Sequence, residues 1–279
     1  MRLFFLTALT MIAFAANSVL NRLALETGDM GPASFAAIRL TSGALMLAVL
    51  VLWRDKGVTA LRNGISWRGP AMLALYVLGF SFAYVTLDAG VGALILFGGV
   101  QITMFAGAVL AGEDIPANRR AGAALAFGGL LWLMWPQGGV APDGTGAALM
   151  MAAAVGWGIY SLIGRQAGDP LTATATNFVL AAPVGLLVWA LLPDAVSGRG
   201  AWLAVISGMV TSGLGYALWY RVLPGLPAAV AAVAQLSVPV IAMAGGVAFL
   251  GEVSGPRFVV AAGLVMGGVV VSLCRANRR

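Results

Sequence analysis

The chain has 279 residues, of which 61% are hydrophobic and only 9% are charged. Soluble domains are about half apolar and about a quarter charged, so this composition excludes an ordinary soluble fold. A formal net charge of +6 would suggest nucleic-acid binding in a soluble protein, but in a membrane protein basic loops explain it. We therefore expect an integral membrane protein whose partners are lipid and a small solute, with no nucleic acid.

Apolar segments follow one another along the whole chain, and each is long enough to cross about 30 Å of hydrocarbon as a helix. The in-out alternation of a membrane barrel is missing, and open strands have no hydrogen-bond partners in lipid. The predicted fold is all-α, with ten transmembrane helices. The expected spans are 3–24, 33–53, 68–87, 90–110, 119–135, 145–164, 171–192, 201–220, 227–250 and 257–274.

The first span has an alternative interpretation as a signal peptide, because its residues include an Ala-x-Ala pattern. However, the segment continues without a break into the stretch from Asn17 to Arg22, and a similar stretch, Tyr160 to Arg165, occurs later in the chain. A transmembrane helix is therefore the prediction.

Basic residues predict the orientation of the spans. With a cytoplasmic N-terminus, twelve of the sixteen basic residues lie in inside loops or ends, whereas Arg22, Arg199 and Arg257 lie outside and Arg39 lies within the second span. Cytoplasmic loops carry the excess of Lys and Arg. We expect a multi-pass protein of the bacterial inner (plasma) membrane, with both termini in the cytoplasm.

The two halves of the sequence resemble each other, which divides the chain into residues 1–139 and 140–279. The correspondences at an offset of 139 residues are Gly112-Glu113 with Gly251-Glu252, Ala124 with Gly263, Gly128 with Gly267, and Gly129 with Gly268. Because five spans per half is an odd number, equivalent helices must cross the membrane in opposite directions. Such inverted repeats place a substrate site between them and allow alternating access.

The resemblance to a known family is carried by Pro32 with Arg39 in the second span, by the stretch from Pro239 to Glu252, and by the Gly-rich fifth and tenth spans. In this order the pattern resembles the drug/metabolite transporter superfamily, and within it the EamA-type ten-helix transporters. The resemblance implies a central cavity beside spans three, four, six, eight and nine, and it places the second span away from that cavity.

Polar groups inside a bilayer are costly unless they are paired or face water, and aromatic side chains can stack on a solute, so both types are candidates for the transport path. For the amides, lining the path and bonding between helices are equally good interpretations; for the aromatic stripes, the alternative is packing. The candidates are Asn17, Asn21, Phe80, Tyr84, Gln101, Trp157, Tyr160, Tyr216 and Gln235.

Arg39 is the only ionised residue well inside a predicted span. It can bind a substrate carboxylate through a bidentate pair, or it can be structural. We favour a structural pair with backbone carbonyls or a loop acid. Glu113 and Glu252 are expected to cap helices or pair with loops. Small residues in the fifth and tenth spans predict close helix packing along Ala124-x3-Gly128 and Gly263-x3-Gly267.

Enzyme and channel functions are both disfavoured. The chain contains no histidine, which excludes a serine–histidine site and an imidazole-ligated metal. A channel would need carbonyl filters or rings of like charge, and the sequence shows neither. We expect a carrier with no catalytic residue, cofactor or metal; a ligand-sensing membrane protein is the remaining alternative.

The expected solute is neutral or zwitterionic. The first span has no carboxylate for a proton or a cationic drug, and Arg39 alone is too little for phosphate. Among the superfamily, the chain most resembles the YddG-type amino acid exporters, which implies outward movement of aromatic and other neutral amino acids. We expect uncoupled efflux; the alternative is proton-driven export of another small metabolite or drug. The sequence is compatible with a monomer and specifies no oligomer.

Overall fold

The computed structural model describes residues 2–55, 66–110, 117–135, 142–164, 168–222, 234–235, 237–253 and 255–273, and no strand occurs within these ranges. Six helical segments in them are long and apolar enough to cross a membrane, and four more apolar helices are shorter. The helices are α1 (Arg2–Leu25), α2 (Pro32–Asp55), α4 (Arg68–Ala83), α5 (Ala89–Leu110), α6 (Ala117–Met134), α7 (Gly144–Gly164), α8 (Pro170–Leu191), α9 (Gly198–Ile206), the π-helical η1 (Ser207–Leu214), α10 (Gly215–Val222), α12 (Ser237–Leu250) and α13 (Pro256–Leu273).

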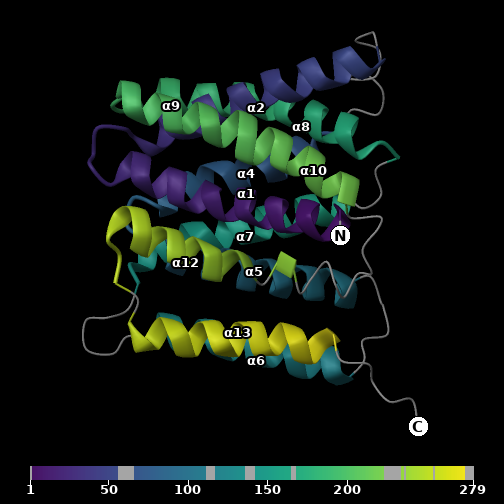
Figure 1. Ribbon diagram of the computed structural model, residues 1–279, viewed down its shortest axis with the longest axis vertical. Helices are drawn as coiled ribbons and strands as arrows, with labels where there is room; N and C mark the ends of the chain where they lie inside the picture. Colours follow the sequence, from purple (N-terminus) through teal and green to yellow (C-terminus); the bar gives the residue numbers. More distant parts are fainter. Residues whose placement is uncertain are drawn as a thin grey trace.

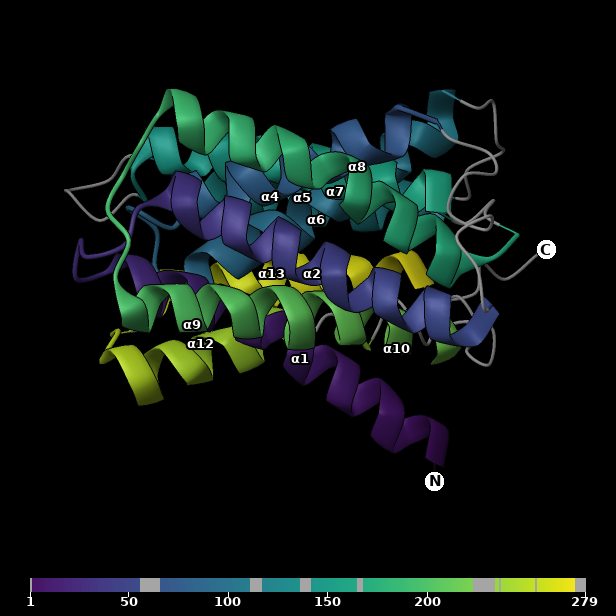
Figure 2. The ribbon, with the colours of Figure 1, turned by 90° about the horizontal axis from the view of Figure 1, so that it is seen from above.

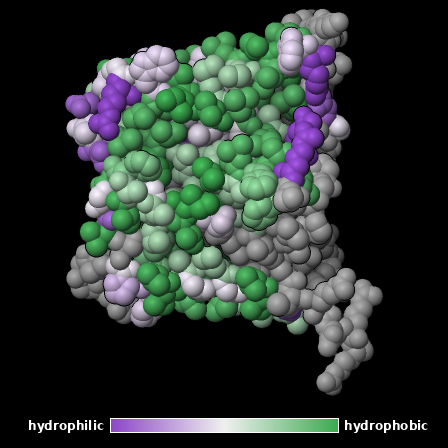
Figure 3. All heavy atoms as spheres, in the orientation of Figure 1, coloured by the Kyte–Doolittle hydropathy of each residue, from purple (hydrophilic) through white to green (hydrophobic). Residues whose placement is uncertain are grey.

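The helices lie side by side with their axes roughly aligned, from α2, α8 and α9 at one side of the molecule to α6 and α13 at the other (Figures 1 and 2). On the face drawn in Figure 3, a broad apolar band separates two polar edges. Large apolar side chains such as Phe5, Leu110 and Phe249 are more than half exposed on the surface. Such a band is the surface that a bilayer covers, so the prediction of an all-helical integral membrane protein is confirmed.

Most of the close helix pairs join the first half of the chain to the second. α2 packs along α8, α4 along α7, and α6 along α13, while α5 packs against α7 and α12. α1 packs against α12 and against the continuous rod formed by α9, η1 and α10. The two halves therefore share one packed interior.

The helices lie close to the predicted spans, with two differences. The third span was expected to reach residue 87, but α4 ends at Ala83, and Tyr84 to Leu87 form a hydrogen-bonded turn. The eighth span was expected to be a regular helix, but its centre is π-helical. The predicted start of the ninth span at residue 227 lies outside the described residues, and α12 begins at Ser237.

Carboxylates cap helices at the edge of the molecule that carries Arg22, which we call the Arg22 edge. Asp194 accepts hydrogen bonds from the backbone nitrogens of Ala33 (2.7 Å) and Ser34 (3.0 Å) at the start of α2. Glu252 accepts from the backbone nitrogen of Ala89 at the start of α5 (2.8 Å) and lies 3.9 Å from the Arg22 guanidinium. Glu252 therefore caps a neighbouring helix, where the N-terminal dipole favours a negative charge. Glu113 lies outside the described residues.

An ion pair ties α2 to α8 at the opposite edge, the Arg54 edge. Arg54 pairs with Asp169, which also caps α8 through the backbone nitrogen of Thr172. The Arg54 hydrogen bond lowers the pKa of Asp169 to about 2. The pair therefore stays ionised throughout the physiological pH range.

The helices α6 and α13 pack closely through glycines, as expected, but each of these glycines lies one residue after a glycine that was predicted to form the contact. A Cβ added at Gly128 or Gly263 would meet no atom within 4 Å. A Cβ at Gly268 would lie 2.5 Å from the carbonyl oxygen of Gly122, and one at Gly129 would lie 2.8 Å from the Cβ of Leu264. The close approach runs through Gly129 and Gly268, so the expected ridges along Gly128 and Gly263 were placed on the wrong side of these helices.

Substitution of Gly268 by alanine is expected to destabilise the protein, because the new methyl group collides with the backbone of α6 and forces the helices apart. Overpacking of this kind costs about 1–3 kcal/mol. The apparent melting temperature of the purified protein in detergent should fall clearly for Gly268→Ala. The matched Gly263→Ala change should leave it unchanged or slightly raised, since alanine is the better helix former. Equal shifts for both variants would contradict this packing.

Candidate functional site

A small cavity lies between five helices of the central region. Its volume is about 10 Å³, and its lining comes from α1, α4, α5, α7 and α10. The lining residues are Phe14, Asn17, Tyr76, Phe80, Leu96, Phe97, Trp157 and Tyr216. A cavity of this size has room for about one water molecule, so any larger solute must part the surrounding side chains.

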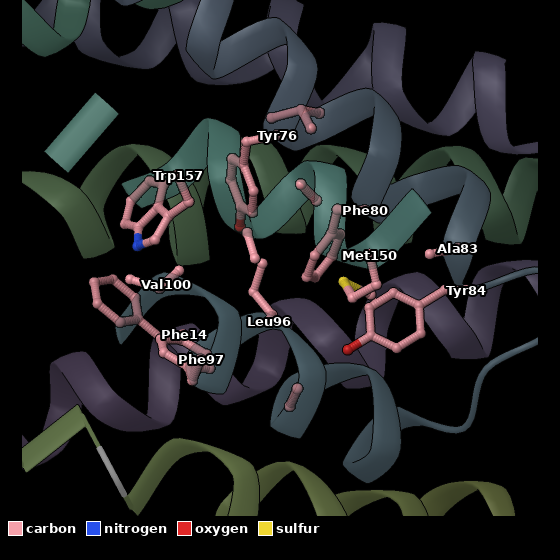
Figure 4. Packing of buried hydrophobic residues seen from close by; sticks show 14 of the residues in the cluster. Phe14, Tyr76, Phe80, Ala83, Tyr84, Leu96, Phe97, Val100, Met150 and Trp157 are labelled. Carbon is pink, nitrogen blue, oxygen red and sulfur yellow. The ribbon is translucent and has the colours of Figure 1, made fainter. Parts of the chain in front are cut away.

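Aromatic rings form most of the cavity wall (Figure 4). The ring of Trp157 lies 4.8 Å from that of Tyr76 and 4.9 Å from that of Tyr216, centroid to centroid. Phe14 meets Tyr216 edge-to-face at 5.7 Å, and Tyr76 is tilted on Phe80 at 5.5 Å. Such pairs are stabilised beyond their buried area by favourable ring electrostatics. The wall is therefore mainly aromatic, and its polar groups come from Asn17, Tyr76 and Tyr216.

Arg39 lies directly behind this wall and is fully buried. Its Nη2 donates to the hydroxyl of Tyr76 (3.1 Å), and its Nε donates to the hydroxyl of Ser212 (3.1 Å). The guanidinium carbon lies 4.9 Å from the ring centroid of Phe80 and 5.4 Å from that of Tyr76, within cation–π range. The expectation of backbone carbonyls or a loop acid as partners is therefore wrong: the partners are hydroxyls and aromatic faces.

Asn17 is the second polar centre of the site. Its Oδ1 lies within hydrogen-bonding distance of the hydroxyls of Ser207, Thr211 and Ser212, and its Nδ2 lies 3.4 Å from the carbonyl of Thr211. Ser212 also accepts from Arg39, so one buried network joins the two residues.

The π-helical turn explains how these hydroxyls meet. Bonding from residue i to i+5 widens the turn, so Ser207 and Ser212, five residues apart, come to the same side of η1. Gly208 allows this segment to approach α2, because a Cβ there would lie 2.3 Å from the carbonyl oxygen of Arg39. π-Helical turns are common at functional sites.

The structure divides the predicted path residues into two groups. Asn17, Phe80, Trp157 and Tyr216 line the cavity. The other candidates do not line it; they are the buried Asn21, Tyr84 and Tyr160 and the half-buried Gln101 and Gln235. Asn21 donates to the hydroxyl of Ser81 (3.1 Å), and Tyr84 donates to the carbonyl of Ala89 (3.3 Å). In the structure, the side chains of Asn21 and Tyr84 therefore form contacts between helices and turns and do not line the cavity.

Four lining residues were not among the candidates: Phe14, Tyr76, Leu96 and Phe97. Two of them had a usable signal. Tyr76 belongs to the same every-fourth-residue stripe as Phe80, and Phe14 lies three residues before Asn17, on the same helix face. Leu96 and Phe97 lie in a uniformly apolar run, where nothing in the sequence separates lining from packing.

Comparison with known proteins places the chain in a family. Residues 144–274 match the EamA-like transporter family. An uncharacterized protein of Pseudomonas aeruginosa is 47% identical over 274 residues, which cover 98% of this chain and 94% of that protein. This chain belongs to the EamA-like transporter family. It is accordingly a multi-pass membrane transporter of the drug/metabolite transporter superfamily.

More distant relatives of this EamA-like transporter span nearly the same length. An uncharacterized transporter of Archaeoglobus fulgidus is 26% identical over 87% of this chain and 88% of its own. A probable terminal-alkyne amino-acid exporter of Streptantibioticus cattleyicolor is 26% identical over 97% of this chain and 92% of its own. A protein of known crystal structure, 21% identical, superposes with a TM-score of 0.67 over 97% of this chain and 99% of its own, which shows a shared fold.

Asn17→Ala should destabilise this EamA-like transporter more than Asn21→Ala does. The first change leaves three buried hydroxyls without their shared acceptor, whereas the second removes one hydrogen bond. An unsatisfied buried polar group costs about 1–3 kcal/mol. Thermal unfolding of the purified variants should therefore show the larger loss for Asn17→Ala. An equal or larger loss for Asn21→Ala would contradict the network.

Proposed function

We propose that this transporter exports neutral and aromatic amino acids, and similar small zwitterionic metabolites, from the cytoplasm by alternating access. The observation that carries the proposal is the aromatic cavity between the two halves of the chain, with polar groups from Asn17, Tyr76 and Tyr216 in its wall. Aromatic rings suit an apolar or aromatic side chain, while the polar groups suit the charged end of an amino acid.

The architecture in this proposal is ten spans in two inverted five-helix repeats, residues 1–139 and 140–279. The contacts between helices support it. If each span of the first repeat is exchanged with the equivalent span of the second repeat, five spans later, the same helix pairs result. The pairs α2–α8, α5–α12 and α6–α13 then map onto themselves, and α4–α7 maps onto the pair of α1 with the α9–α10 rod. A cavity between such repeats can open to either side of the membrane in turn.

The proposed orientation places the Arg54 edge in the cytoplasm of a bacterial inner membrane. The N-terminal end of α1 and the C-terminal end of α13 lie at the same edge of the molecule (Figure 1). In the proposed topology Arg54, Arg68 and Arg120 also belong to this edge, which agrees with the positive-inside rule.

The amino acid assignment has support from one relative, the Streptantibioticus protein named as a probable terminal-alkyne amino-acid exporter. The chemistry of the cavity agrees with it. A phosphorylated solute would need several cations, but Arg39 is the only Lys or Arg close to the described cavity wall.

The purified protein in liposomes should exchange amino acids. Liposomes loaded with unlabelled phenylalanine should accumulate labelled phenylalanine transiently and saturably, and methionine and threonine should compete. Protein-free liposomes and liposomes loaded with glucose are the controls. If no amino acid gives counterflow with protein that is folded and correctly inserted, the substrate assignment is wrong.

The proposed efflux runs down the concentration gradient of the solute and is not coupled to protons. Among the described residues, every Asp and Glu lies in a loop or at a helix end, at an edge of the molecule. A transmembrane pH gradient should therefore drive no accumulation of labelled phenylalanine above the equilibrium level.

Proton antiport of another metabolite or drug is the alternative, and one observation favours it. Glu252 is half-buried, and burial raises its pKa above the usual carboxyl value. If a pH gradient does drive accumulation and Glu252→Gln abolishes it, the uncoupled mechanism is refuted. The matched Asp194→Asn change, in another helix cap at the Arg22 edge, is the control.

A further inference from the structure

We infer that Arg39, together with the hydroxyls of Tyr76 and Tyr216, forms the recognition site for the carboxylate of the transported solute. The solute class is then an aromatic or apolar carboxylate, with or without an amino group. This inference rests on the proposed function, since it identifies which end of that solute the cavity recognises.

The first observation is a set of unused hydrogen-bond donors. Arg39 is 0% exposed, and its Nη1 has no partner among the described residues. Tyr216 lies 3.4 Å from Tyr76, hydroxyl to hydroxyl, and Tyr76 also accepts from Arg39. Tyr216 donates its hydroxyl proton to Tyr76, so the hydroxyl proton of Tyr76 has no acceptor within this group of three residues. A carboxylate accepts hydrogen bonds without donating any, so it fits this surplus.

The second observation is a positive charge without a counter-charge. No carboxylate pairs with Arg39 among the described residues, and the acidic side chains placed there lie at the edges of the molecule. The faces of Phe80 and Tyr76 offset part of the cost of burying the charge. An isolated buried charge is otherwise strongly unfavourable, and a bidentate carboxylate is the partner that a guanidinium matches best.

The third observation is position. Tyr76, Phe80 and Tyr216 line the cavity, and the first two also touch Arg39. A solute that parts these rings therefore reaches the guanidinium through the phenol side of the wall. Phe14 and Trp157 line the same cavity and pack against Tyr216, so they are available to contact an apolar side chain.

The lining offers no carboxylate to pair with an ammonium group. It contains no acidic residue, and the Oδ1 of Asn17 is already shared by three hydroxyls. The carboxylate is therefore the required group, and the amino group is optional.

A competition experiment tests this inference on the protein reconstituted in liposomes. Counterflow of labelled phenylalanine is measured against 3-phenylpropionate and phenylpyruvate, which keep the carboxylate, and against phenethylamine and phenylalaninamide, which lack it. The two acids should inhibit within about tenfold of phenylalanine, and the two amines about 100-fold more weakly, as expected for loss of a charge-assisted bidentate pair. Equal inhibition by the amines would overturn the inference.

Conservative variants locate the effect. Tyr76→Phe and Tyr216→Phe keep the rings but lose the hydroxyls, and each should raise KM for phenylalanine about tenfold with little change in maximal rate. Tyr84→Phe is the matched control, because its hydroxyl is bonded outside the cavity to Ala89. Arg39→Lys keeps the positive charge but loses the bidentate hydrogen-bonding geometry of the guanidinium, so it should also raise KM. If this variant does not fold, the tyrosine variants alone test the site. Equal KM values for all three tyrosine variants would overturn the site.

A binding measurement separates this inference from the export proposal. The melting temperature of the detergent-purified protein should rise with 3-phenylpropionate but not with phenethylamine, and the rise should be smaller in Tyr76→Phe. If no amino acid is transported but this selective rise is seen, export fails and the carboxylate site stands. If phenylalanine is transported but the rise is absent or equal for both compounds, export stands and the carboxylate site fails.

Discussion

A guanidinium held inside the membrane-spanning region, with no carboxylate partner in the described part of the chain, is the constraint on which the centre of this protein depends. Arg39 can remain there only while Ser212 and Tyr76 accept its hydrogen bonds and the rings of Tyr76 and Phe80 face it. Those groups come from η1 and α4, so the buried charge requires α2, α4 and η1 to meet at one point. Separating them would leave a charge in an apolar medium at a cost of several kcal/mol.

Close backbone packing makes this meeting possible. Lipid tails are as apolar as leucine, so helices in a bilayer associate through fit and polar contacts more than through the hydrophobic effect. Gly208 brings η1 against the carbonyl of Arg39, and Gly268 brings α13 against α6. The first contact serves the polar centre, whereas the second lies at the far side of the molecule from α2 and α8 (Figure 1) and serves packing.

The chain belongs to the EamA-like transporter family, and the aromatic cavity at its centre is small. A volume of about 10 Å³ excludes an amino acid until the aromatic wall opens. In our proposal, the solute compensates for opening the wall, because ring–solute contacts replace the lost ring–ring contacts and its carboxylate pairs with Arg39.

The length of each apolar run determined which segments form helices, because a helix is the structure that satisfies its own backbone in lipid. Only the tertiary structure decided which face of each helix meets protein. Segments that are apolar on all sides carry no periodic signal, so Gly129 and Gly268 could not be told from Gly128 and Gly263. The π-helical turn and the partners of Arg39 were equally hidden, since both depend on helices that lie far apart in the sequence.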